Sequence, residues 1–162
     1  MGLYAQLNSM WRERPQELVN SLRERRIRWR REPAVVRVDK PLRLDRARSI
    51  GYKDKQGVVV LRVRVRRGGF ARPRPNSGRR PKAIGAVLHK VNVEMREEAL
   101  NRARRRYPNL HPLGAYELFS DSMYKWFEVI MIDPYHPSIV SDREVELPGP
   151  LRRRVTKRMG DG

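Results

Sequence analysis

The sequence predicts an α+β fold, in which helices pack on an antiparallel sheet, and two patterns lead to this class. Short strand candidates occupy residues 34–38, 57–66, 113–119 and 125–132, and the second of them alternates with the period of a strand. Longer stretches with helical spacing occupy residues 3–31 and 92–107. Since helices and strands interleave in one short chain, a single sheet covered by helices is the economical arrangement. An extended basic arm and a basic tail complete the predicted fold.

The length of 162 residues suits one ordinary domain. We expect this α+β domain to span residues 1–140, with the N-terminal helices and a basic arm at 67–85 inside it. Residues 141–162 are predicted to form a polar and basic C-terminal extension.

The stretch 3–31 is predicted to be helical. Leu22 and Trp29 recur at helical spacing, and arginines crowd the positions around them. Pro15 suits the first turn of a helix. Pro33 ends the helical stretch at or before the preceding residue, because a proline disfavours the α conformation just before it.

Residues 39–56 have poor periodicity and contain Pro41 and Gly51, so we expect a loop that includes up to one helical turn. The next stretch, 57–66, is predicted to be a strand. The arm at 67–85 is rich in Gly, Pro and Arg, a composition that cannot close a core of its own.

The stretch 92–107 is the most strongly predicted helix. Asn92 suits the N-cap, and glutamates lie in the first turns while arginines crowd the last ones. Both placements complement the helix macrodipole. The strands at 113–119 and 125–132 flank SDSMY, a turn-forming cluster, and are predicted to form a hairpin.

Net charge is the dominant property of the composition. There are 37 Lys and Arg against 18 Asp and Glu, for a formal net charge of +19. Such an excess repels itself in the compact state, and a polyanionic partner is the usual resolution. Nucleic acid is the leading candidate, through phosphate neutralisation and counterion release. The bias towards arginine favours the same partner, because guanidinium binds phosphate bidentately and stacks on bases.

Other classes of protein are disfavoured by the composition. The chain has no cysteine, which excludes disulfides, thiolate zinc sites and cysteine nucleophiles. No apolar run is long enough to span a membrane, and the first residues lack the apolar region of a secretion signal. We therefore expect neither a membrane partner nor a secreted protein.

The strand at 57–66 raises a specific question about its two faces. Alternate apolar residues, Val59 to Val65, account for a core face, whereas Arg62, Arg64 and Arg66 share the other parity. The window 55–93 contains no Asp or Glu. These arginines therefore form a solvated face, pair with an acid from another strand such as Glu117 or Glu128, or bind phosphate.

The arm that follows favours the phosphate interpretation of this segment. Its stretch RPRPNSGRRPK has the composition of a segment that becomes ordered in a groove of folded RNA. Phe70 within it stacks on a base or anchors the arm on the core, and the sequence favours neither. Combined with the basic N-terminal helix, this segment contributes the following candidate RNA contacts: Arg26, Arg30, Arg72, Arg74, Arg79, Arg80 and Lys82.

The aromatic residues, Trp11, Trp29 and Trp126 among them, are expected to fill the core rather than to stack on bases.

Catalytic interpretations find little support in the sequence. The three histidines have no metal-ligand spacing, and His136 is expected to be a cap or loop residue. Glu128 and Asp133 lie five residues apart and fall on opposite faces of a strand. We expect no enzyme activity, no cofactor, no metal and no small-molecule substrate.

Three blocks of the sequence resemble a known family. They are RLDRARSIGYKDKQGVVVLRVRVRRGG at 43–69, YPNLHPLGAYELFSDSMYKWFEVIMIDPYHPSI at 107–139 and the opening MGLYAQLNSMWRE. They are similar to blocks of the archaeal and eukaryotic-type large-subunit ribosomal protein L-fifteen-e family, whose first block contains RxDKAR and GYKAKQG. The resemblance covers roughly residues 1–139.

The resemblance implies a cytoplasmic, structural constituent of the large ribosomal subunit, which binds ribosomal RNA, contacts neighbouring large-subunit proteins and supports translation. It implies an α+β fold with an antiparallel sheet. The alternative is a free-standing RNA- or DNA-binding architectural or processing protein. The residues of the first block that the resemblance implies as RNA contacts are Arg43, Arg46, Arg48, Tyr52, Lys53, Lys55, Arg62, Arg64, Arg66 and Arg67.

Overall fold

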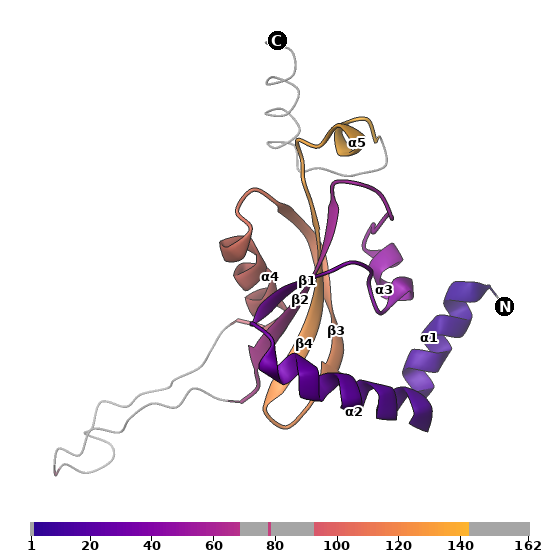
Figure 1. Ribbon diagram of the computed structural model, residues 1–162, viewed down its shortest axis with the longest axis vertical. Coiled ribbons are helices and arrows are strands. Elements are labelled where there is room, and N and C mark those ends of the chain that lie inside the picture. The colour runs from indigo at the N-terminus through magenta and orange to yellow at the C-terminus, as the bar shows by residue number, and fades with distance from the viewer. Residues whose placement is uncertain (1, 69–77, 79–92, 143–162) are drawn as a thin grey trace.

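Four antiparallel strands form one sheet at the centre of the molecule, in the order β1-β2-β4-β3 (Figure 1). The structure is a computed structural model that describes residues 2–68, 78 and 93–142. The predicted α+β class is confirmed. The elements are α1 (Leu3–Glu13), α2 (Gln16–Arg31), β1 (Val35–Val38), α3 (Leu44–Ser49), β2 (Val58–Arg66), α4 (Met95–Arg106), β3 (His111–Ser120), β4 (Tyr124–Ile132) and α5 (Pro137–Val140).

The predicted helical stretch 3–31 is divided into two helices. Arg14 adopts a left-handed conformation with φ of 50°, and its backbone N–H closes α1 by donating to the carbonyl of Met10. Pro15 follows as the N-cap of α2. Since a proline cannot donate a backbone hydrogen bond, the chain turns here and α2 starts in a new direction.

Two other elements differ at their ends from the prediction. The loop predicted at 39–56 contains α3, a helix of six residues, which ends before Gly51 at a positive φ of 101°. Glu94, rather than Asn92, is the N-cap residue of α4. Nearly all of the arm at 67–85 and of the extension at 141–162 lies outside the described residues, so these two segments remain predictions.

The predicted hairpin at 113–119 and 125–132 is confirmed as β3 and β4. β2 pairs with the other side of β4 over nine residues, from Val58 opposite Ile132 to Arg66 opposite Tyr124. β3 carries a register shift next to Gly114, where an added Cβ would lie 2.8 Å from Ile50 Cγ2. Glycine therefore allows the segment after α3 to lie directly against the sheet.

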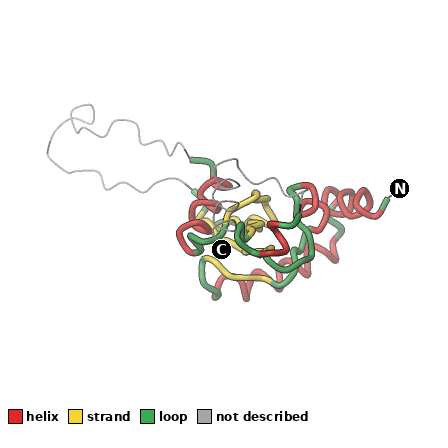
Figure 2. The backbone as a smooth tube through the Cα atoms, turned by 90° about the horizontal axis from the view of Figure 1, so that it is seen from above, coloured by secondary structure: helices red, strands yellow, loops and turns green. Residues whose placement is uncertain are grey.

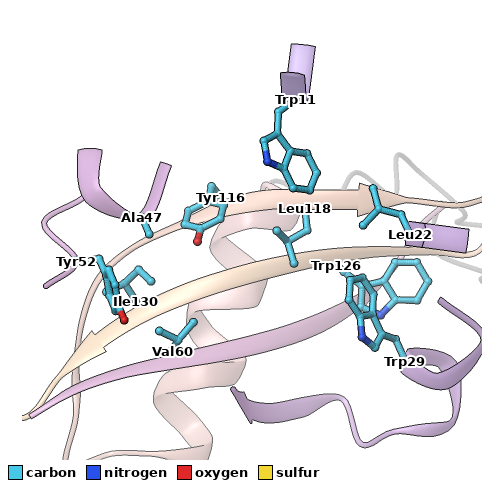
Figure 3. Packing of buried hydrophobic residues seen from close by; sticks show 10 residues of the cluster. All are labelled: Trp11, Leu22, Trp29, Ala47, Tyr52, Val60, Tyr116, Leu118, Trp126 and Ile130. Carbon is cyan, nitrogen blue, oxygen red and sulfur yellow. The ribbon is translucent and has the colours of Figure 1, made fainter. Parts of the chain in front are cut away.

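Helices cover both faces of this sheet. Figure 1 shows α4 on one side and α1 and α3 on the other, with α2 below the sheet in this view. Leu22 and Trp29 place α2 in the same cluster of buried residues as α1 and α3. We call this side the aromatic face, drawn in Figure 3: Trp11, Leu22, Trp29, Ala47, Tyr52, Val60, Tyr116, Leu118, Trp126 and Ile130.

The opposite side, under α4, is the aliphatic face. Its buried residues are Leu61, Val63, Val65, Ala99, Ala103, Ala115, Phe127, Val129 and Met131. Both alanines of α4 are fully buried, so the helix packs closely on β2, β3 and β4. The prediction that the three tryptophans fill a core is confirmed.

The first helix is held at one end only. α1 buries Trp11 near its C-terminus, whereas Leu3 and Tyr4 at its start are exposed. Figure 2 shows this helix extending away from the sheet towards the N-terminus.

Candidate nucleic-acid interface

The arginine row of β2 lies on the aromatic face, partly beneath the end of α2. Arg62 has 14% of its side chain exposed and forms an ion pair with Glu32, the C-cap residue of α2. Its guanidinium also lies 4.5 Å from the centroid of the Trp29 ring. The ion pair of this arginine is thus with a residue at a helix end. Glu128, which lies opposite Arg62 on β4, also attracts it electrostatically, as the sequence suggested.

Arg64 is also engaged by α2. Its Nη1 donates to the backbone carbonyls of Arg30 and Trp29, and its guanidinium lies 4.9 Å from the Tyr124 ring centroid. Carbonyls in the last turn of a helix carry partial negative charge, so a cation is favourable there. Arg66, one step further along β2, is exposed and has no ion pair or hydrogen bond from its side chain to another described residue.

The turn between β3 and β4 is bound by two further arginines, Arg30 and Arg67. Asp121 accepts hydrogen bonds from Arg30 at 2.6 Å and from the backbone N–H groups of Met123 and Tyr124. Burial alone would raise the pKa of Asp121, but these donors together lower it below its ordinary value. The guanidinium of Arg67 donates to the backbone carbonyl of Asp121 at 3.1 Å. Arg30 and Arg67 therefore hold this turn against α2 and β2.

Arg43 is enclosed by the aromatic face rather than displayed on the surface. It forms an ion pair with Asp45 at 2.9 Å, and its guanidinium lies 4.9 Å from the Trp11 ring centroid. Arg26 is similarly half-buried, 5.8 Å from the Phe119 ring centroid. Both arginines connect helices to the body of the protein.

Three further candidates of the first block have internal roles. Tyr52 is a core residue with 4% exposure, and its pKa is raised by burial and by the nearby Asp54 carboxylate. Lys53 and Lys55 both form ion pairs with Asp142, and Lys55 also donates to the carbonyl of Ser138 at 3.0 Å. This part of the block connects the segment before β2 to the residues around α5.

The last two candidates of this block face solvent. Arg46 and Arg48 lie on α3 and are exposed. Neither side chain forms an ion pair or hydrogen bond with another described residue. They resemble Arg66 in this respect. The remaining candidates, Arg72, Arg74, Arg79, Arg80 and Lys82, lie outside the described residues.

The two arginines of α2 that the sequence suggested as RNA contacts, Arg26 and Arg30, both have a contact within the chain. Arg26 and Arg30 follow Leu22 at intervals of four, so they share the side of the helix that faces the body. Arg23 and Arg31 belong to the neighbouring stripe, which faces solvent together with the exposed Ile27. The helical phase set by the buried leucine was the signal that would have identified them.

The buried carboxylate of the aromatic face is structural. Glu128 is 1% exposed and accepts hydrogen bonds from the Tyr116 hydroxyl at 2.6 Å and the Leu42 backbone N–H at 2.9 Å. Burial raises its pKa, although these donors act in the opposite direction. The buried acid therefore joins the loop before α3 to the centre of the sheet.

The described residues offer no grouping of three or more His, Asp or Glu side chains suited to holding a metal ion. His136 is the N-cap of α5 and accepts a hydrogen bond from the Ser138 N–H, as expected of a capping residue. Within the same residues, no helix is both long enough and apolar enough to cross a membrane.

The interface thus divides into two kinds of arginine. One kind is engaged within the chain by acids, backbone carbonyls or aromatic rings, and it fixes helices and the β3–β4 turn to the sheet. The other kind is exposed and has no acidic partner among the described residues. On α2, α3 and the end of β2 it includes Arg23, Arg31, Arg46, Arg48 and Arg66. Arginines of the second kind can donate hydrogen bonds to a phosphate without first breaking a contact within the chain.

Comparison with protein families decides the class of the protein. A model of the family Ribosomal_L15e, described as Ribosomal L15, matches residues 2–154. The chain belongs to this family. It is a ribosomal protein, a structural constituent of the large subunit, and part of the translation machinery. Membership confirms the resemblance found in the sequence and favours the ribosomal interpretation over a free-standing nucleic-acid-binding protein.

Proposed function

We propose that this ribosomal protein binds large-subunit ribosomal RNA through the exposed arginines of α2, α3 and the end of β2. The paired arginines, Arg62 and Arg64 above all, hold α2 and the sheet in the orientation that presents the exposed ones. Binding rests on phosphate contacts and on RNA shape more than on base recognition. Neighbouring large-subunit proteins are its other partners, and its place is the cytoplasmic ribosome.

One observation carries this proposal. Arg23, Arg31 and Arg66 are exposed without an acidic partner in the described part of a chain whose net charge is +19. Arginine side chains with no internal partner add self-repulsion to the folded protein, and phosphates remove it. Arg66 also ends β2 where the basic arm begins, so the arm is expected to extend the same interface.

The salt dependence of binding tests the proposal. The variant Arg23→Gln/Arg31→Gln/Arg66→Gln should bind large-subunit ribosomal RNA more weakly than the natural chain. The log–log slope of affinity against salt should fall by about 2 to 3 units, since each lost phosphate contact removes about 0.7 to 0.9 of a unit. Filter binding between low and moderate salt measures this slope.

A matched variant removes the same charge elsewhere. Arg12→Gln/Arg37→Gln/Lys40→Gln changes three exposed cations near the end of α1 and around β1. We expect a smaller change of slope from this variant. If both variants lower the slope equally, binding depends on total charge and the localised interface is wrong.

A further inference from the structure

A second group of unpaired arginines lies at the end of α4. Arg104, Arg105 and Arg106 are exposed, and none forms an ion pair or hydrogen bond from its side chain to another described residue. The glutamates of α4 lie at the opposite end of the helix, and Glu98 is engaged by Arg102 at 2.9 Å. The C-terminal end of this helix is therefore a concentrated positive charge.

The helix macrodipole explains only part of this concentration. Cations in the last turn of a helix are favourable by about 0.3 to 1 kcal/mol each at exposed positions. Consecutive residues on a helix point about 100° apart, so the three guanidinium groups spread around the helix end instead of forming one stripe. The field of Arg104 also contributes, after burial, to the lowered pKa of His111 in β3. Such an arrangement suits a curved, anionic backbone more than one acidic side chain.

Arg102 differs from its three neighbours and shows what an internal role looks like on this helix. Its Nη1 donates to the backbone carbonyl of Arg64 in β2 at 2.8 Å, in addition to its pair with Glu98. It therefore fixes α4 to the sheet. The last three arginines make no comparable contact with the described residues.

The position of α4 separates these arginines from the interface on α2. Ala99 and Ala103 bury α4 on the aliphatic face, whereas Leu22 and Trp29 bury α2 on the aromatic face. Packed layers lie about 10 Å apart, so the two helix axes lie on the order of 20 Å apart. RNA backbone that contacts the end of α4 therefore lies on the other side of the sheet from RNA backbone that contacts α2.

We propose that Arg104, Arg105 and Arg106 form a second phosphate-binding surface, so that the protein holds two separate segments of ribosomal RNA on opposite faces of its sheet. This inference rests on the proposed function, because the α2 surface supplies the first of the two contacts. The rigid sheet between the two helices fixes the distance between the RNA segments.

Directed cleavage of RNA tests this arrangement in assembled large subunits. The chain has no natural cysteine, so one introduced cysteine is the only attachment point for an iron chelate that generates hydroxyl radicals. Glu24→Cys places the probe on the solvent side of α2, and Asn109→Cys places it beside the end of α4. Both positions are exposed, and neither belongs to the arginine surfaces.

We expect the two probes to cleave two separate segments of ribosomal RNA. In the Asn109→Cys chain, the further changes Arg104→Gln/Arg105→Gln/Arg106→Gln should reduce cleavage at the second segment. In the Glu24→Cys chain, the same changes should leave cleavage at the first segment as it was. The three arginine changes should also lower the log–log slope of RNA affinity against salt concentration by about 2 to 3 units. If the triple variant proves poorly folded by circular dichroism, Arg105→Gln alone should act in the same direction.

The other possible outcomes distinguish failure of the second surface from failure of the proposed function. The inference is overturned if the probe beside α4 cleaves no RNA, if it cleaves the same nucleotides as the probe on α2, or if its cleavage survives the arginine changes. If neither probe cleaves RNA, the proposed function itself fails. Cleavage from α2 alone leaves the proposed function standing and removes the second surface.

Discussion

The two faces of the sheet use different chemistry to hold their helices. The aromatic face contains all three tryptophans, a buried glutamate and arginines that contact aromatic rings. The aliphatic face is built from Val, Leu, Met and Ala, with Phe127 as its one fully buried aromatic among the described residues. The first face joins three helices to the sheet, and the second joins one.

The difference follows from what each face must accommodate. Small side chains at Ala99 and Ala103 let one helix lie close to the strands, and Arg102 adds a hydrogen bond to the backbone carbonyl of Arg64. The aromatic face receives α1, α2 and α3 at different angles, and large rings fill the unequal gaps between them. Ring faces also attract guanidinium groups, so basic residues can be partly buried there. The arginines that contact aromatic rings, Arg26, Arg43, Arg62 and Arg64, accordingly lie on this face.

Removing the Trp126 ring from the aromatic face should lower the stability of the protein more than any other change considered. Trp126 is 1% exposed, and its ring centroid lies 6.1 Å from that of Trp29 and 6.2 Å from that of Phe119. Trp126→Ala should lower the free energy of unfolding by about 3 to 5 kcal/mol, measured by urea denaturation. Loss of the Trp29 environment should accompany it in near-UV circular dichroism. A cost under 1 kcal/mol would show that the aromatic face is not the stabilising one.

Loss of a hydrogen bond to Glu128, the buried acid of the aromatic face, should have the next largest effect on stability. Tyr116→Phe removes the hydroxyl that donates to Glu128 at 2.6 Å. Hydrogen bonds to charged groups contribute about 1.5 to 3 kcal/mol, so the unfolding free energy at neutral pH should fall by about that amount. Urea denaturation at a series of pH values measures it.

The pH dependence of this variant has a definite sign. Burial raises the pKa of Glu128 above 4.5, so the folded state retains a proton that the unfolded state releases. The contribution of Glu128 to stability is therefore full below pH 4.5 and is lost as the pH rises through the folded-state pKa. The variant loses a donor that favours the carboxylate, so this pKa rises further. The difference from the natural chain should be larger at neutral pH than near pH 4; a constant difference would contradict this account.

Overpacking the aliphatic face should cost somewhat less. Ala103 is fully buried between α4 and the sheet. Ala103→Leu should lower the unfolding free energy by about 1 to 3 kcal/mol, because the helix cannot move outward without losing its contact with β2. Arg105→Leu, at an exposed position of the same helix, is the control and should change stability by less than about 0.5 kcal/mol. Equal effects from the two variants would argue against close packing.

Local patterns were sufficient to predict most of the fold. The strand period of β2, the turn cluster between β3 and β4, and the charge gradient along α4 are all properties of neighbouring residues. Pro15 indicated the start of α2, but the left-handed conformation of Arg14 that ends α1 was not predicted, because it carries no glycine or asparagine signal. The family blocks identified the class of protein from the same local stretches.

The candidate site was harder to predict, because its pairing depends on contacts distant in sequence. Glu32 reaches Arg62 only because α2 ends above β2, and Asp142 pairs with Lys55 from the far end of the described chain. A basic motif does not say which of its members packs inward, as the burial of Tyr52 shows. Helical phase alone, applied to α2, was the information left unused.

The smallest expected change in stability distinguishes the two kinds of arginine within β2, where Arg62 is paired and Arg66 is exposed. Arg62→Gln loses the pair with Glu32 and the contact with the Trp29 ring, so the unfolding free energy should fall by about 1 to 2 kcal/mol. Arg66→Gln, four residues later on the same parity, should change stability by less than about 0.5 kcal/mol. Urea denaturation of both variants measures these differences.

Binding of ribosomal RNA should rank the same two variants in the opposite order. Arg66 can meet a phosphate directly, so Arg66→Gln should lower the salt slope by up to about one unit. Arg62 is already paired and half-buried, so Arg62→Gln should leave the slope nearly unchanged under conditions where it is folded. If Arg62→Gln lowers the slope as much as Arg66→Gln, the ion pair with Glu32 opens on binding. The whole arginine row of β2 would then face RNA, and the division between structural and binding arginines would not hold.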